Sequence, residues 1–259
     1  MKNDNVKVVL LCGGKGTRLR EETAFKPKSL VEIGGKPILW HIMKIYSHYG
    51  FNNFIICLGY KGDMIKEYFQ NYSLYNSDTT MKVAKREIQF ENHASEDWNV
   101  TLADTGEETN TGGRIKKIEK YIDTDYFLAT YGDGVADINI SKLIDYHLKN
   151  GKIATVTGLH PTSKYGILDI DDKGTVTYFK EKPILKEWVS GGFFVFNKKL
   201  FKYYLSENCI LERETFEQLV KDKELNVYKH EGFWGSMDTY KDLEYLDDVW
   251  QKEKKWKMW

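Results

Sequence analysis

A short apolar run followed at once by a glycine-rich turn is the feature that most constrains the fold of this chain. Residues 6–11 (VKVVLL) are typical of a buried strand, and residues 12–19 (CGGKGTRL) follow directly. Three glycines in four residues let the backbone turn tightly and approach a ligand, and their N–H groups can form an anion-binding nest. Arg18, Lys26 and Lys28 add positive charge beside the turn. The pattern predicts a phosphate site at the end of a first strand.

Two better-known glycine-rich motifs do not match this turn. A Walker A loop requires Ser or Thr after its Gly-Lys pair, whereas Gly16 follows Lys15 here. The dinucleotide fingerprint requires a third glycine where this chain has Leu19, and a helix directly afterwards. Residues 21–27 are instead expected to form an extended basic loop. An ordinary glycine-rich turn is the remaining alternative, and the adjoining segment 26–28 (KPK) disfavours it.

Composition and charge limit the classes of partner. The 259 residues include 38 basic and 38 acidic side chains, so the formal net charge is zero and we expect no nucleic-acid partner. The three cysteines are widely spaced and form no CxxC pair, which indicates reduced thiols. No apolar run approaches the roughly 20 residues of a membrane span. We therefore expect a cytoplasmic protein without a membrane partner.

Strands and helices alternate along the first half of the chain. Residues 54–58 and 126–131 are typical of buried strands, while residues 38–49 and 63–72 have helical apolar spacing. Such alternation predicts a parallel sheet with right-handed crossovers. We therefore expect an α/β fold with a Rossmann-like, mostly parallel mixed sheet.

The second half is richer in strands. A hairpin is predicted around residues 172–174 (DKG), because these are turn residues between two apolar runs. The chain contains no internal repeat and no linker of low complexity. We expect one domain, 1–259, with a first half at 1–150 and a β-rich second half at 151–259.

Asp133 is a candidate metal ligand. It follows the strand predicted at 126–131 and lies between Gly132 and Gly134. Ligands of open α/β sheets collect at the carboxyl ends of strands, where a carboxylate is well placed for an ion. The alternative is a plain turn residue, since Asp-Gly is a common turn pair.

The pattern Gly-Gly-x-Gly-Thr-Arg-Leu followed by Lys-Pro-Lys resembles the signature of the sugar nucleotidylyltransferases. These enzymes join a nucleoside triphosphate to a sugar 1-phosphate and release pyrophosphate. The segment 105–114 (TGEETNTGGR) and the ending 256–259 (WKMW) resemble the glucose-1-phosphate cytidylyltransferase branch. The resemblance covers nearly the whole chain. It implies CTP and a hexose 1-phosphate, α-D-glucose 1-phosphate in that branch, as substrates, Mg²⁺ as cofactor, and a homo-oligomer, by family resemblance a hexamer.

The resemblance also implies roles for individual residues. Arg18 and Lys28 would be catalytic and take the charge that develops on the phosphates, while Asp133 and Asp238 would hold the metal. Thr109 would contact the base or ribose, and Arg114 would face phosphate. The implied nucleotide site comprises Leu11, Cys12, Gly13, Gly14, Gly16, Thr17, Arg18, Lys28, Thr109, Arg114 and Gly132. The implied sugar-phosphate site comprises Gly166, Glu181, Lys182 and Gly192.

Several alternatives stay open. Asp238 is also placed to cap the helix predicted at 240–252, and Glu181–Lys182 also fits a solvated charge pair. Ser190 stands where the family commonly has Asn, which leaves the identity of the sugar open. Another nucleotide or sugar phosphate, or a non-catalytic nucleotide-sensing subunit, are the alternatives for the whole chain. Residues 73–98 are polar and are interpreted as a lid or an oligomer contact.

Overall fold

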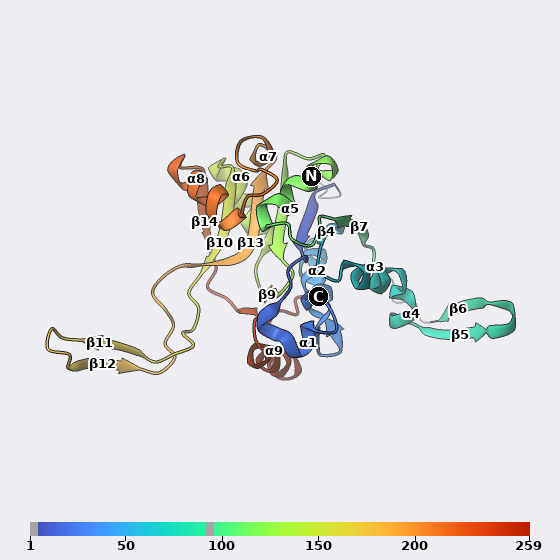
Figure 1. Cartoon of the computed structure of the whole chain (residues 1–259), viewed down its shortest axis with the longest axis horizontal. Helices are drawn as coiled ribbons and strands as arrows, with labels where there is room; N and C mark the ends of the chain where they lie inside the picture. The colour runs from blue at the N-terminus through green and yellow to red at the C-terminus, as the bar shows by residue number, and fades with distance from the viewer. Residues whose placement is uncertain (1–4, 92–95) are drawn as a thin grey trace.

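A seven-stranded sheet forms the centre of the molecule in the computed structural model, which describes residues 5–91 and 96–259 (Figure 1). The strand order is β14-β10-β13-β8-β1-β4-β7. β13 runs antiparallel to both of its neighbours, and the other neighbouring pairs are parallel. The predicted α/β fold with a mostly parallel mixed sheet is confirmed. The strands are β1 (Lys7–Leu11), β4 (Asn53–Leu58), β7 (Asn99–Asp104), β8 (Tyr126–Tyr131), β10 (Ala154–Leu159), β13 (Val189–Asn197) and β14 (Leu225–Lys229).

Helices cover both faces of this sheet, which explains why β1 is apolar throughout rather than alternating. Val8 and Leu10 pack into one hydrophobic core, and Val9 and Leu11 pack into a second core on the opposite face. The first core is closed by α2 (Ile38–His48), α6 (Ile140–Asn150) and α9 (Tyr240–Lys252). The second core is closed by α5 (Thr111–Lys117), α7 (Leu200–Tyr203) and α8 (Phe216–Lys221).

Strands from both halves of the chain share the sheet. β13, from the second half, pairs with β8, from the first half, between Phe193–Thr130 and Asn197–Tyr126. The end of β8 therefore lies between the glycine-rich turn that follows β1 and the β-rich part of the chain.

The segment that follows the glycine-rich turn is more helical than expected. It forms the 3-10 turn η1 (Thr17–Leu19) and the single turn α1 (Arg20–Thr23), so the prediction of an extended loop over 21–27 was wrong for its first part. The Thr23 hydroxyl supports both turns, because it donates to the carbonyls of Leu19 at 2.9 Å and Gly16 at 3.0 Å. The 3-10 turn η2 (Lys28–Leu30) follows.

Two hairpin arms project from opposite sides of the molecule (Figure 1). The first arm pairs β5 (Asp78–Lys82) with β6 (Glu87–Glu91), and α3 (Gly62–Gln70) and α4 (Tyr72–Asn76) precede it. The second arm pairs β11 (Ile167–Ile170) with β12 (Val176–Lys180), which confirms the predicted hairpin. Of the segment 73–98, residues 92–95 lie outside the described residues. None of the described helices is long and apolar enough to cross a membrane.

Candidate active site

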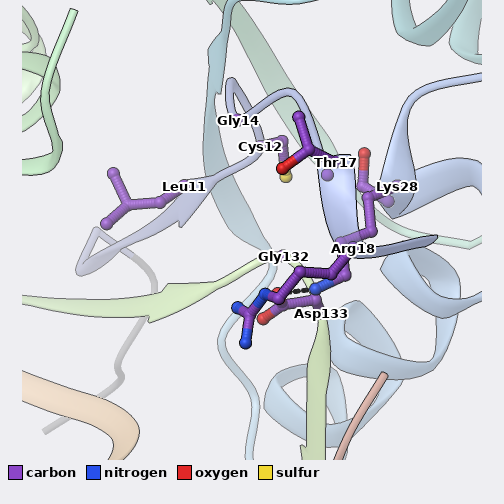
Figure 2. Close-up of a pocket in the computed structure, with 10 residues that line it drawn as sticks. Leu11, Cys12, Gly14, Thr17, Arg18, Lys28, Gly132 and Asp133 are labelled. Carbon is purple, nitrogen blue, oxygen red and sulfur yellow. Dashed lines mark hydrogen bonds and ion pairs between the residues drawn. The ribbon is translucent and has the colours of Figure 1, made fainter. Parts of the chain in front are cut away.

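A pocket of about 250 Å³ opens where the glycine-rich turn meets the end of β8 (Figure 2). Leu11 on β1 pairs with Tyr131 on β8, so the residues that follow each strand lie side by side. Gly132 is required at this contact, because a Cβ there would lie 2.6 Å from the sulfur of Cys12. The pocket is lined by Leu11, Cys12, Gly14, Gly16, Thr17, Arg18, Lys28, Ser29, Gly132 and Asp133.

Four charged side chains from distant parts of the sequence meet at this pocket. The Nζ of Lys28 lies 2.6 Å from Oδ2 of Asp133 and 2.9 Å from Oδ1 of Asp238. Arg18 Nη2 lies 2.9 Å from the same oxygen of Asp238. The Lys28 side chain is 13% exposed, whereas that of Arg18 is 73% exposed. Lys28 is therefore the inner cation of the pair and Arg18 the outer one (Figure 2).

A two-stranded ribbon brings the two aspartates together. β9 (Gly134–Ala136) starts directly after Asp133 and pairs antiparallel with β15 (Trp234–Ser236), which ends two residues before Asp238. The N–H of Met237 also donates to the carbonyl of Asp133 at 2.9 Å. Pairing across the ribbon therefore holds both carboxylates at one end of it.

Neighbouring cations keep Asp238 ionised. Burial alone would raise the pKa of its carboxyl, but the hydrogen bond and charge of Lys28, followed by the charge of Arg18, lower the pKa below its ordinary value. Cys12 differs, because burial raises the pKa of its thiol to about 12. A neutral thiol is a poor nucleophile, so Cys12 is not suited to attack a substrate.

Comparison with known proteins identifies the family of this chain. A family model described as nucleotidyl transferase matches residues 7–254. The chain belongs to the nucleotidyl transferase family. The chain is 49% identical over 257 residues to the glucose-1-phosphate cytidylyltransferase of Salmonella typhi, covering 98% of this chain and 100% of that one. A probable glucose-1-phosphate cytidylyltransferase of Bacillus subtilis is 47% identical over 256 residues, with 98% and 100% covered. The predicted family resemblance is confirmed.

A solved structure agrees on the fold of this nucleotidyl transferase. HddC from Yersinia pseudotuberculosis superposes with a TM-score of 0.66 at 23% identity, covering 95% of this chain and 99% of that one. At this level of identity the likeness concerns the fold alone.

The residues present fit a divalent cation. Asp133 and Asp238 each place a carboxylate oxygen within 2.9 Å of one ammonium nitrogen, so both already contact a single cation. The described residues contain no group of three or more His, Cys, Asp or Glu side chains that could hold a metal. Mg²⁺ suits a site of this kind, because it is usually bound by one or two carboxylates together with phosphate oxygens and water.

Hydrogen bonds within the segment 105–114 and to its neighbours hold this segment in place. Arg114 is 4% exposed and does not line the pocket, because its guanidinium donates to five neighbouring oxygens. We expected Arg114 to face phosphate, whereas its guanidinium faces these five protein oxygens. The hydroxyl of Thr109 donates to the carbonyl of Thr105 at 2.6 Å and accepts from Lys117 at 3.1 Å.

The four residues expected around the sugar phosphate do not line the described pocket. Gly192 lies on β13 against Tyr131, and a Cβ there would lie 2.4 Å from the tyrosine ring. Gly166 and Glu181 are adjacent at the root of the second arm, since a Cβ on Gly166 would lie 3.0 Å from Oε2 of Glu181. Lys182 follows with a positive φ of 45°. Their contact with the sugar stays a prediction.

Ser29 is a lining residue that the sequence reasoning missed. Ser29 as a whole residue is 2% exposed, and it follows Lys28 in η2. Its position next to the predicted catalytic lysine was the available signal. Both residues line the pocket because they lie in one turn of 3-10 helix. The sequence pattern did not predict this turn.

Proposed function

We propose that this protein transfers the cytidylyl group of CTP to α-D-glucose 1-phosphate, giving CDP-glucose and pyrophosphate. The observation that carries the proposal is Lys28, held between Asp133 and Asp238 in a pocket walled by the glycine-rich turn. The names of relatives at 47–49% identity over nearly their full length support the choice of CTP and glucose 1-phosphate.

The proposed chemistry needs no covalent intermediate. An oxygen of the sugar phosphate attacks the α-phosphorus in line, and pyrophosphate leaves on the opposite side. Catalysis is then positioning together with neutralisation of developing charge. Lys28 and Arg18 would neutralise the transferred phosphate and the pyrophosphate, and the Gly14 and Gly16 amides would bind phosphate oxygens.

Asp133 and Asp238 would hold Mg²⁺, which when bound supplies Lewis-acid charge neutralisation to the phosphates. Lys28 occupies the space between the two carboxylates. Its ammonium would therefore turn from the carboxylates toward the phosphates when the substrates and the metal bind.

A cytoplasmic location and a homo-oligomer, by family resemblance a hexamer, complete the proposal. The three cysteines are buried and unpaired, which suits a reducing compartment. The two arms expose large apolar side chains, which include Val83 at 83% and Phe179 at 61% exposure. Isolated two-stranded hairpins are marginally stable in water, so we propose that the arms pack against other copies of the chain.

The choice of base is testable by product formation with each triphosphate at equal concentration and saturating glucose 1-phosphate. Cytosine presents an amine at position 4 and an acceptor at N3, whereas uracil reverses both. One unmatched buried hydrogen bond costs about 1–3 kcal/mol. We therefore expect CTP to exceed UTP and dTTP by at least about 10²-fold in kcat/KM. If kcat/KM for UTP equals that for CTP, the proposed choice of base is wrong, and the proposal of nucleotidyl transfer is unaffected.

The same assay of product formation distinguishes an enzyme from the alternative, a non-catalytic nucleotide-sensing subunit. A sensing subunit would bind CTP and release no pyrophosphate with any sugar phosphate. A screen of several sugar 1-phosphates would also identify the sugar, which Ser190 leaves open.

A further inference from the structure

Arg114 is a buried cation whose hydrogen bonds all go to neutral groups. It lies on α5, its residue is 4% exposed, and no ion pair among the described residues includes it. Each of its five acceptors is a neutral oxygen. Nη1 donates to Leu58 O at 3.0 Å, Thr105 Oγ1 at 2.8 Å and Gly106 O at 2.7 Å, and Nη2 donates to Gly13 O at 3.0 Å and Glu107 O at 2.9 Å.

Arg114 is hydrogen-bonded to the glycine-rich turn at the carbonyl of Gly13. This carbonyl accepts from Arg114 Nη2 at 3.0 Å and from the N–H of Tyr60 at 3.1 Å, so two donors hold its direction. The guanidinium lies directly on the turn, because a Cβ at Gly13 would lie 2.1 Å from Arg114 Nη1. A Cβ at Gly59 would lie 2.6 Å from the same nitrogen. Glycine at 13 and 59 is thus required to admit the guanidinium.

The direction of this carbonyl determines the direction of the next amide. The C=O of Gly13 and the N–H of Gly14 belong to one planar trans peptide group, in which they point in opposite directions. Holding the carbonyl toward Arg114 therefore turns the Gly14 N–H away from Arg114. Gly14 lines the pocket, and its N–H donates to none of the described residues.

We propose that Arg114 is a positioning residue for the nucleotide phosphates, acting through the Gly13–Gly14 peptide rather than by contact. It orients the Gly14 N–H as a donor for a phosphate oxygen. Its guanidinium forms no ion pair among the described residues, and the charges of Asp104 and Glu108 act on it from nearby. The inference rests on the proposed function in one respect, namely that the pocket receives the phosphates of a nucleotide.

The test uses two probes that separate phosphate from base. Inorganic pyrophosphate and cytidine are titrated separately by calorimetry into the wild-type protein and into Arg114→Lys, which keeps the charge and loses the five-donor fork. We expect the affinity for pyrophosphate to fall about 10-fold or more, the scale of one lost charge-assisted contact. The affinity for cytidine should stay close to the wild-type value.

Lys117→Met is the matched control. Lys117 lies on the same helix and donates to Thr105 O at 2.9 Å and to Thr109 Oγ1 at 3.1 Å, and neither hydrogen bond involves Gly13. Its replacement should leave the binding of pyrophosphate unchanged. If Arg114→Lys does not fold, Gly13→Ala provides the second variant, because its methyl group would displace the guanidinium while the arginine remains. This variant should lose affinity for pyrophosphate in the same way.

Two results would overturn the proposal. Unchanged pyrophosphate affinity in a folded Arg114→Lys protein would exclude positioning through the peptide. Loss of cytidine binding with retained pyrophosphate binding would assign Arg114 to the base instead. Both measurements report binding, so they remain interpretable even if the wild-type protein transfers no cytidylyl group.

Discussion

At the scale of single residues, Lys28 is the side chain on which the proposed reaction depends most. It is 13% exposed and contacts both aspartates of the site. We expect Lys28→Ala to lower kcat about 10²–10³-fold, the scale of losing one transition-state charge contact. Lys26→Ala is the control, because Lys26 is two residues away and pairs with Glu22 at 3.3 Å instead. Comparable turnover by both variants would remove Lys28 from the mechanism.

The two aspartates give the second residue-scale prediction. Asp133→Asn and Asp238→Asn should each abolish the Mg²⁺-dependent reaction, because each removes one charged ligand of the proposed metal. Stability should change little, since Lys28 keeps one carboxylate partner in either variant. Activity across a Mg²⁺ titration and thermal unfolding measure the two effects. Asp248→Asn, on the exposed side of α9 beside Lys252, is the control. Full activity of either variant at low Mg²⁺ would contradict the metal assignment.

At the scale of elements, α2 and the C-terminal segment meet at a buried histidine. His41 Nδ1 accepts from Trp256 Nε1 at 3.3 Å and its Nε2 lies 2.8 Å from Ile33 O, so the ring is neutral. Burial lowers the pKa of His41 to about 4. The unfolded chain therefore binds more protons than the folded one between about pH 6.5 and pH 4, and stability falls as the pH drops through that range.

For His41 alone this loss is about 2 kcal/mol between pH 7 and pH 5. Urea unfolding at the two pH values should show a smaller pH-dependent loss for His41→Gln than for the wild type. His48→Gln, at an exposed position at the end of the same helix, should behave like the wild type. Equal pH dependence in all three proteins would exclude His41 as the titrating group.

At the scale of the whole molecule, the second arm is the proposed contact between copies. Leu168 and Phe179 are paired across its two strands and are 54% and 61% exposed. We expect Leu168→Asp with Phe179→Asp to reduce the assembly size measured by light scattering, because charges oppose burial of this face. Lys173→Asp, in the turn of the same arm, should keep the wild-type assembly. An unchanged mass in the double variant would show that the arm makes no such contact.

Elements were predictable where their signals are local. The helix predicted at 240–252 has those bounds in the structure, because Thr239 and Asp242 form a capping box at its start. The hairpin at 172–174 follows from a turn that needs a positive φ, here 82° at Gly174. The single turn α1 was missed, because it is only four residues long and part of its support is the hydroxyl of Thr23, which donates back to Leu19 and Gly16.

The sequence by itself determined the α/β class, the glycine-rich turn after the first strand and the family, because these depend on periodicity, glycine spacing and short motifs within single segments. Only the tertiary structure decided which groups meet. The β9–β15 ribbon joins Asp133 to Asp238 across 105 positions, and Lys28 then lies between them. The sequence also does not reveal that the guanidinium of Arg114 donates hydrogen bonds to the carbonyl of Gly13 and to four other protein oxygens. Long-range contacts of this kind arise from sheet order and packing, which no local pattern encodes.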